Sequence, residues 1–138
     1  MVHSTSGYCI MLAGAPISYT SKRQQCIALS STEAEIMAAS LAATEIAYLR
    51  EIFRDLGLYQ RDATELYVDN SGAVELARER KVMHRSRHIT RRQLRVREYV
   101  AEGIVNVRPV ATADNPSNIF TKPLGRASFE KHRSFFMP

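Results

Sequence analysis

The alternation of apolar and polar residues predicts a β-hairpin at the start of the chain. Residues 7–12 form a short apolar run, and residues 13–16, which include Gly and Pro, suit a turn. Residues 17–20 are the expected antiparallel partner, running on toward Gln25. The pattern therefore predicts two paired strands before residue 25.

The apolar spacing then changes to that of a helix, expected from about Thr32 to Leu56. Two overlapping capping boxes mark its start, Ser30 with Glu33 and Thr32 with Glu35. Alanines concentrated in its first two thirds indicate close packing against a sheet. Gly57 is the expected stop, after apolar residues that recur at helical spacing, namely Leu49, Ile52, Phe53 and Leu56.

Helices and strands alternate along the rest of the chain. Residues 65–69 and 104–110 are predicted strands, and residues 70–78 and 87–101 are predicted helices. A last short helix is expected to start near Asn115, because Pro suits the first helical position. A hairpin followed by this alternation implies an α/β fold, in which helices cover a mixed sheet.

Length and composition fit one compact domain, with 138 residues of which 45% are hydrophobic. No apolar run approaches the ~20 residues that a membrane-spanning helix requires. Residues 1–4 lack the features of a signal peptide, and Cys9 and Cys26 are isolated. These features predict an intracellular protein of a reducing compartment, with no membrane partner.

Positive charge is concentrated in one segment. The formal net charge is +5, and residues 78–97 hold nine Arg or Lys against one acid, Glu79. A polyanion is the natural partner of such a field, whereas a face that only serves solubility usually mixes both signs. We therefore expect nucleic-acid contact, with a solvated helix face as the alternative.

Two acidic residues stand at positions suited to chemistry. Asp69 ends a predicted strand just before a helix, at the edge of a sheet where α/β proteins place their sites. Its structural alternative is a neighbour of the helix N-cap. Glu35 lies one turn into the long predicted helix, and its structural alternative is the capping box with Thr32. For Glu35 taken alone, the capping box is the stronger interpretation.

Five short motifs follow one another along the chain. They are residues 4–8 (STSGY), 28–38 (ALSSTEAEIMA), 67–70 (YVDN), 85–89 (RSRHI) and 114–124 (DNPSNIFTKPL). In this order they resemble the ribonuclease H domain of copia-type retrotransposon polyproteins. Any one motif would be weak evidence, whereas five in order are specific. The resemblance implies a ribonuclease H-like domain over residues 1–124, incomplete at its N-terminus, and a C-terminal tail over residues 125–138. The aromatic side chains of the tail are expected to dock on the body of the domain or on a neighbouring one.

That resemblance implies hydrolysis of the RNA strand of an RNA–DNA hybrid by two Mg²⁺ ions, held by four acids. Glu35 matches the family's helical glutamate and Asp69 its strand-end aspartate, so these two are the expected metal ligands. The family's C-terminal aspartate falls at Asn118, whose amide carries no charge. We therefore expect Mg²⁺ to bind weakly or not at all, and turnover to be very low.

The family's first aspartate lies on a central strand upstream of Ser4, which this chain does not contain. Without that strand, the hairpin and the later parallel pair should each expose an unpaired edge. We interpret the chain as a degenerate piece of a longer polyprotein. A host-adopted protein that completes its sheet by pairing is the less economical alternative.

The basic motif and the helix after it supply the expected nucleic-acid contacts: Arg85, Arg87, His88, Arg91, Arg92 and Arg95. The implied partners are an RNA–DNA hybrid or another duplex, and the reverse transcriptase domain upstream in the parent polyprotein. The implied setting is a cytoplasmic virus-like particle or the nucleus. Two other interpretations stay open, a non-catalytic module that binds nucleic acid and an inert fragment without a stable fold.

Overall fold

The strands form two separate pairs. In the computed structural model, which describes residues 3–24, 30–78 and 87–137, β1 (Thr5–Leu12) pairs antiparallel with β2 (Ala15–Arg23). β3 (Thr64–Val68) pairs in parallel with β4 (Val105–Pro109). Within the described residues, β1 and β3 each keep one edge without a strand partner. This arrangement confirms the predicted α/β class and is compatible with a ribonuclease H-like sheet that lacks its central strand.

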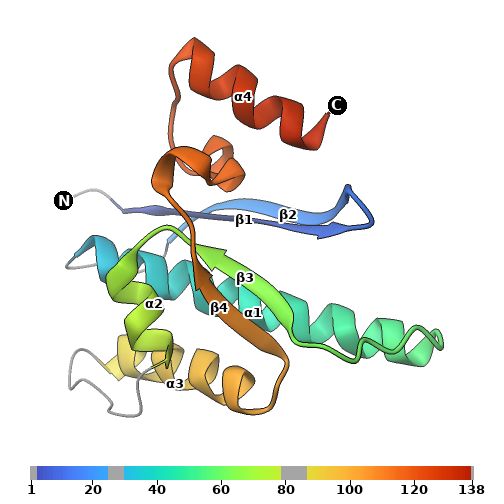
Figure 1. The fold of residues 1–138 in the computed structure, drawn as a ribbon. Coiled ribbons are helices and arrows are strands. Elements are labelled where there is room, and N and C mark those ends of the chain that lie inside the picture. The colour runs from blue at the N-terminus through green and yellow to red at the C-terminus, as the bar shows by residue number, and fades with distance from the viewer. Residues whose placement is uncertain (1–2, 25–29, 79–86, 138) are drawn as a thin grey trace.

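Helices connect and cover the two strand pairs (Figure 1). The long helix α1 (Ser31–Asp55) contacts both β1 and β3. α2 (Ser71–Arg78) and α3 (Arg87–Ala101) pack against the β3–β4 pair and against α1. No helix in the described part of the chain is both long and apolar enough to cross a lipid bilayer.

The hairpin turn is tighter than its sequence suggests. Only Ala13 and Gly14 lie between the strands, and both adopt positive φ angles, 51° and 83°. Two such residues form the turn whose twist matches the strands of a hairpin. As a result Pro16 lies within β2, opposite Met11, next to a register shift in the pairing. Pro is tolerated there because irregular pairing does not need its missing N–H.

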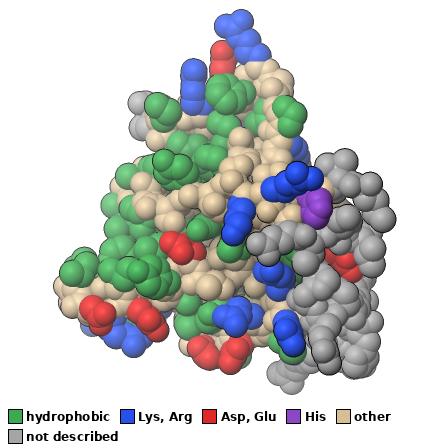
Figure 2. Space-filling model, turned by 180° about the vertical axis from the view of Figure 1, so that it is seen from behind, with side chains coloured by type: hydrophobic (Ala, Val, Ile, Leu, Met, Phe, Trp, Pro, Cys, Tyr) green, Lys and Arg blue, Asp and Glu red, His purple; other side chains and the backbone are tan. Residues whose placement is uncertain are grey.

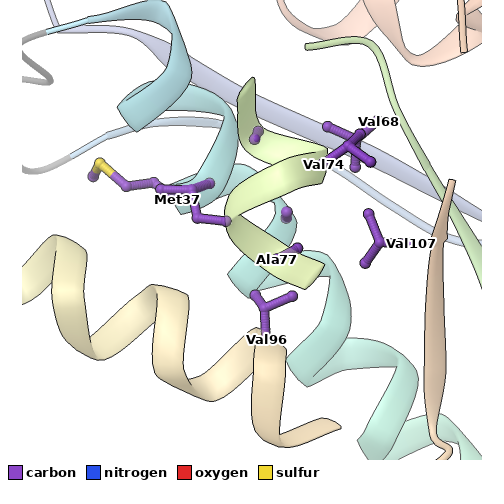
Figure 3. Close-up of a cluster of buried hydrophobic side chains, with 9 residues drawn as sticks. Met37, Val68, Val74, Ala77, Val96 and Val107 are labelled. Atoms are coloured by element: carbon purple, nitrogen blue, oxygen red, sulfur yellow. The ribbon is translucent and has the colours of Figure 1, made fainter. Parts of the chain in front are cut away.

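The main core lies between α1, α2, α3 and the β3–β4 pair. Figure 3 shows side chains from all five elements converging there, including Met37, Val68, Val74, Val96 and Val107. Alanines on α1 are among its buried residues, as the sequence predicted, and they allow the helix to approach the strands closely. This core fixes the end of β3 relative to the first turns of α1, where the expected site residues are.

The segment after β4 contains two short 3-10 helices, η1 (Thr112–Asp114) and η2 (Pro116–Phe120), and then α4 (Arg126–Phe136). The short helix expected near Asn115 is therefore confirmed as η2. Residues 125–138, expected as a tail, include α4, which the sequence pattern did not predict. Phe136 docks on Phe120 with ring centroids 5.4 Å apart, and Phe120 stacks on Tyr19.

Candidate functional site

The start of α1 positions Glu35. Ser30 caps the helix, because its hydroxyl accepts a hydrogen bond from the Glu33 backbone N–H at 3.2 Å. The predicted second capping box does not form, since Thr32 lies inside the helix, and its hydroxyl donates to Asn70 Oδ1 at 3.3 Å. The structural alternative for Glu35 therefore fails. The Glu35 side chain therefore remains available for contacts other than capping.

The end of β3 positions Asp69 in a similar way. Asn70, the next residue, caps α2 by accepting a hydrogen bond from the Ala73 backbone N–H at 2.9 Å. Asp69 is thus not needed for capping. Its Oδ2 accepts a hydrogen bond from Asn115 Nδ2 at 3.2 Å.

The carboxyl groups of Glu35 and Asp69 meet across the gap between α1 and β3. Burial is the main cause that raises the pKa of Glu35 to about 7. The charge of Asp69 and a hydrogen bond between the two side chains raise this pKa further, and Lys122 acts in the opposite direction. Glu35 is therefore about half-protonated near neutral pH, and the proton it holds lies beside the Asp69 carboxyl group.

A cavity of about 350 Å³ opens beside this pair. Its walls are residues 7–11 of β1, residues 64–68 of β3 and the small residues of α1, with Glu35 among the lining side chains. Asn115, Ser117 and Phe135 line it from the C-terminal segment. The cavity thus lies between β1 and β3, which are not paired with each other in the described residues.

Asn118, expected at the position of a family aspartate, is buried, and its side chain forms a hydrogen bond within its own segment. Its Nδ2 donates to the Thr112 backbone oxygen at 2.6 Å, and it does not line the cavity that contains Glu35. From this segment, Asn115 is the residue whose side chain reaches Asp69. Asp114 points elsewhere, forming an exposed ion pair with Lys131 at 3.0 Å.

Two residues of the site were missed by sequence reasoning, Asn115 and Lys122. The Asn-Pro pair at 115–116 predicted the start of a helix, but nothing in its spacing indicated contact with Asp69. Lys122 belongs to the motif at residues 114–124, but nothing in its spacing indicated contact with Glu35. Asn115, between η1 and η2, and Lys122, after η2, are brought to the carboxylates by tertiary folding of this segment.

The expected nucleic-acid contacts are only partly within the described residues. Arg85 lies outside them, and for Arg87 and His88 the backbone of α3 is described but the side chains are not. Arg91 and Arg95 are exposed on α3, and Arg92 is half-buried. Figure 2 shows Lys and Arg side chains spread over this face of the molecule, with several of them beside the residues drawn in grey.

The site fits a pair of Mg²⁺ ions poorly. Within the described residues, no cluster of three His, Cys, Asp or Glu side chains exists. Glu35 and Asp69 can supply at most two negative charges, against four positive charges on two Mg²⁺ ions. The raised pKa of Glu35 reduces that supply further near pH 7. The donor set therefore suits at most one weakly held cation, and no step that needs two metal ions follows from it.

Comparison with known proteins shows similarity to retrotransposon proteins. The chain is 35% identical over 127 residues to the Retrovirus-related Pol polyprotein from transposon TNT 1-94 of Nicotiana tabacum, covering 92% of the chain and 10% of that protein. The corresponding polyproteins from transposons RE2 and RE1 of Arabidopsis thaliana are each 33% identical, over 92% and 95% of the chain and 9% of each polyprotein. The chain thus spans about a tenth of the length of these curated relatives. No protein-family model matches the chain. No solved structure matches it either.

Proposed function

Because the chain is related over most of its length to retrotransposon Pol polyproteins, we propose that it derives from the ribonuclease H region of such a polyprotein and retains little of that activity. The similarity to these polyproteins supports the origin. The five motifs, with the α/β architecture, support this region of the polyprotein. The reverse transcriptase region would be its covalent neighbour there, in a virus-like particle or the nucleus.

The observation that carries the proposal is the meeting of Glu35 and Asp69. Two carboxyl groups that are distant in sequence converge at the end of β3, where a hydrolytic metal site would lie. A shared, partly buried position is costly for two acids and needs a reason beyond stability. The same geometry supports the proposed loss of activity, since the Asn118 side chain donates to Thr112 and no third acid of the described residues joins the pair.

A cleavage assay tests this proposal directly. The purified chain is incubated with Mg²⁺ and an RNA–DNA hybrid labelled on the RNA strand, next to the variants Glu35→Gln and Asp69→Asn. We expect the three proteins to give the same background rate. Clear turnover by the unchanged chain that disappears in both variants would show an intact enzyme and refute the loss of activity.

A second function, non-catalytic binding of the hybrid, is favoured by the exposed Arg91 and Arg95 on α3. Binding of this kind depends on phosphate charges, so it should weaken steeply with salt and vary little with base sequence. Fluorescence anisotropy with hybrids of two unrelated sequences, at 50 mM and 200 mM salt, tests it. Affinity that differs strongly between the sequences and little between the salt concentrations would refute it.

A further inference from the structure

A row of aromatic side chains lies on the side of the hairpin that faces away from α1, where the C-terminal segment covers it (Figure 1). Tyr19 of β2 stacks on Phe120 of η2, with ring centroids 5.8 Å apart and ring planes 11° apart. Phe136 of α4 packs on Phe120 at 5.4 Å, and Phe135 meets Phe136 edge-on at 5.3 Å. We call these four side chains the aromatic row. Three separate elements supply them, so the fold assembles the row.

The ring of Tyr19 has one supported face and one open face. The Ser21 hydroxyl donates a hydrogen bond to the Phe120 backbone oxygen at 2.5 Å, which holds Phe120 against β2. Phe120 therefore covers one face of the Tyr19 ring from a fixed position. The Tyr19 side chain is nevertheless 67% exposed, so its other face is open to solvent. An aromatic ring that is held in place and open on one face is a surface on which an unpaired base can stack.

A second stacking surface follows along α4. The guanidinium group of Arg133 lies over the ring of Phe129, 5.9 Å from its centroid. Phe129, Arg133 and Phe136 recur at intervals of four and three residues, so they share one side of the helix. Guanidinium planes accept bases in the same way as aromatic rings do. Stacking surfaces therefore run from Tyr19 on β2, through the aromatic row, to Phe129 on α4.

The charge around these rings is positive. The hairpin strands and residues 111–137 together hold six Lys or Arg against two acids. Both acids, Asp114 and Glu130, already form ion pairs with cations of α4. In the described part of the chain, no carboxylate pairs with Arg23 of β2 or with Arg133. A surface that docks another protein is usually depleted of charge at its centre, whereas here rings and cations alternate. This combination suits a phosphate backbone that carries exposed bases.

From the open ring of Tyr19, the Arg133–Phe129 pair and the positive charge of these elements, we infer that the outer face of the hairpin and α4 binds single-stranded nucleic acid by stacking unpaired bases. The rings would hold bases and the cations would hold phosphates, so binding should tolerate different sequences. The duplex contact proposed above lies on α3, on the opposite side of the molecule (Figure 1). The single-strand surface is therefore separate from it, and only the class of partner, a nucleic acid, rests on the proposed function.

Fluorescence anisotropy tests this surface with labelled strands of about eight nucleotides. The strands are adenosine RNA, adenosine DNA and an abasic DNA of the same length. The unchanged chain is compared with Tyr19→Leu, which removes the ring and keeps an apolar cover over Phe120, with Tyr19→Phe, and with Arg133→Gln. The matched control is Tyr59→Leu, because Tyr59 is 65% exposed and lies outside the aromatic row. Thermal melts establish that each variant folds.

Tyr19→Leu should weaken binding of the adenosine strands at least about fivefold, since the stacking of one base is lost. Tyr19→Phe and Tyr59→Leu should each stay within about twofold of the unchanged chain. Arg133→Gln should reduce the slope of log K against log salt by about 0.7, whereas Tyr19→Leu should leave that slope unchanged. The abasic strand should bind the unchanged chain more weakly than adenosine DNA does, and should not distinguish it from Tyr19→Leu.

The comparison of adenosine DNA with abasic DNA needs no variant, and equal affinities would overturn the inference. Equal losses in Tyr19→Leu and Tyr59→Leu would overturn it as well. Sedimentation at several concentrations tests a rival occupant, a second copy of the chain. Self-association that Tyr19→Leu abolishes, without any strand binding, would also refute the single-strand surface. Tyr19-dependent binding of either RNA or DNA supports it, and the tighter complex identifies the preferred strand.

Titration of the same variants with an RNA–DNA hybrid separates this inference from the proposed function. Tyr19→Leu should leave hybrid affinity unchanged, because the duplex contact is on α3. Single-strand binding that depends on Tyr19, without hybrid binding, would support the single-strand surface and refute the duplex-binding function alone. Hybrid binding without any single-strand binding would refute the single-strand surface alone.

Discussion

The carboxyl group of Glu35, in the second turn of α1, lies within hydrogen-bonding reach of the carboxyl group of Asp69 at the end of β3. Neither residue is needed as a helix cap, because Ser30 and Asn70 perform that task. The two acids therefore repel each other unless a proton or a cation lies between them. Their joint ionisation should therefore govern how the stability of the chain and its binding of Mg²⁺ depend on pH.

Stability should fall as pH rises toward neutrality. Burial beside Asp69 raises the pKa of Glu35 in the folded chain from the ordinary 4.5 to about 7. Below pH 4.5 Glu35 is protonated in both states and costs nothing. Between these values the unfolded chain loses the proton first, so unfolding is increasingly favoured, by at most about 3 kcal/mol once pH exceeds 7.

Urea unfolding of the chain at pH 5 and pH 8 measures this effect. The Glu35→Gln variant keeps the shape and removes the ionisable group, so its stability should vary less over the same range. An equal loss of stability in the chain and the variant would assign the pH dependence to groups other than Glu35.

Mg²⁺ should bind weakly and release protons. Because Glu35 is about half-protonated at pH 7, a cation that binds the pair should displace roughly half a proton. Calorimetry in two buffers of different ionisation enthalpy measures this release, and Asp69→Asn should abolish the heat of binding. Two tightly bound ions per chain would contradict the charge balance of the site.

Asn118→Asp should destabilise the chain without creating activity. The side chain is 6% exposed and donates to the Thr112 backbone oxygen. A carboxylate there would face a carbonyl oxygen with no hydrogen to donate, at a cost of about 2 kcal/mol. Asn118→Ala, which loses the bond without adding charge, should cost about 1 kcal/mol. Thermal melts compare the two, and an Asp variant that is as stable as the unchanged chain and cleaves hybrid would overturn this assignment.

Gly7→Ala should loosen the contact between β1 and η2. A Cβ atom at Gly7 would lie 2.7 Å from Thr121 Cγ2 and 2.9 Å from Phe120 Cβ, closer than such atoms can approach. The expected cost is about 2 kcal/mol, measured by urea unfolding. Gly125→Ala is the matched control, since no atom lies within 4 Å of its added Cβ. Equal effects of the two substitutions would show that the close approach at Gly7 does not limit stability.

Local sequence signals were sufficient for most elements. The Ser30–Glu33 capping box and the helical spacing that ends at Leu56 predicted α1, and the β-rich run before Asp69 predicted β3. The helix α4 was not predicted because it buries no apolar stripe: its one buried residue is His132, which is 4% exposed, whereas Phe129 and Phe135 are exposed. Propensity and periodicity report on neighbours along the chain, and His132 is buried by tertiary packing.

The site itself was predictable only in part. Glu35 and Asp69 were identified by their motifs, and the structure brings them together. The contact of Asn115 with Asp69 depends on how distant segments fold onto one another. The spacing of residues along the chain does not predict contacts of this kind.

The gap between β1 and β3 also affects how the chain unfolds. Hydrogen bonds across a continuous sheet would join its strands into one cooperative unit. Here no strand in the described residues forms hydrogen bonds with both the β1–β2 pair and the β3–β4 pair. Helix α1, which packs on both β1 and β3, is left as a main tie between them. The hairpin amides should therefore exchange with deuterium through partial openings that leave the packing around Val96 and Val107 intact, so the two regions would show different protection.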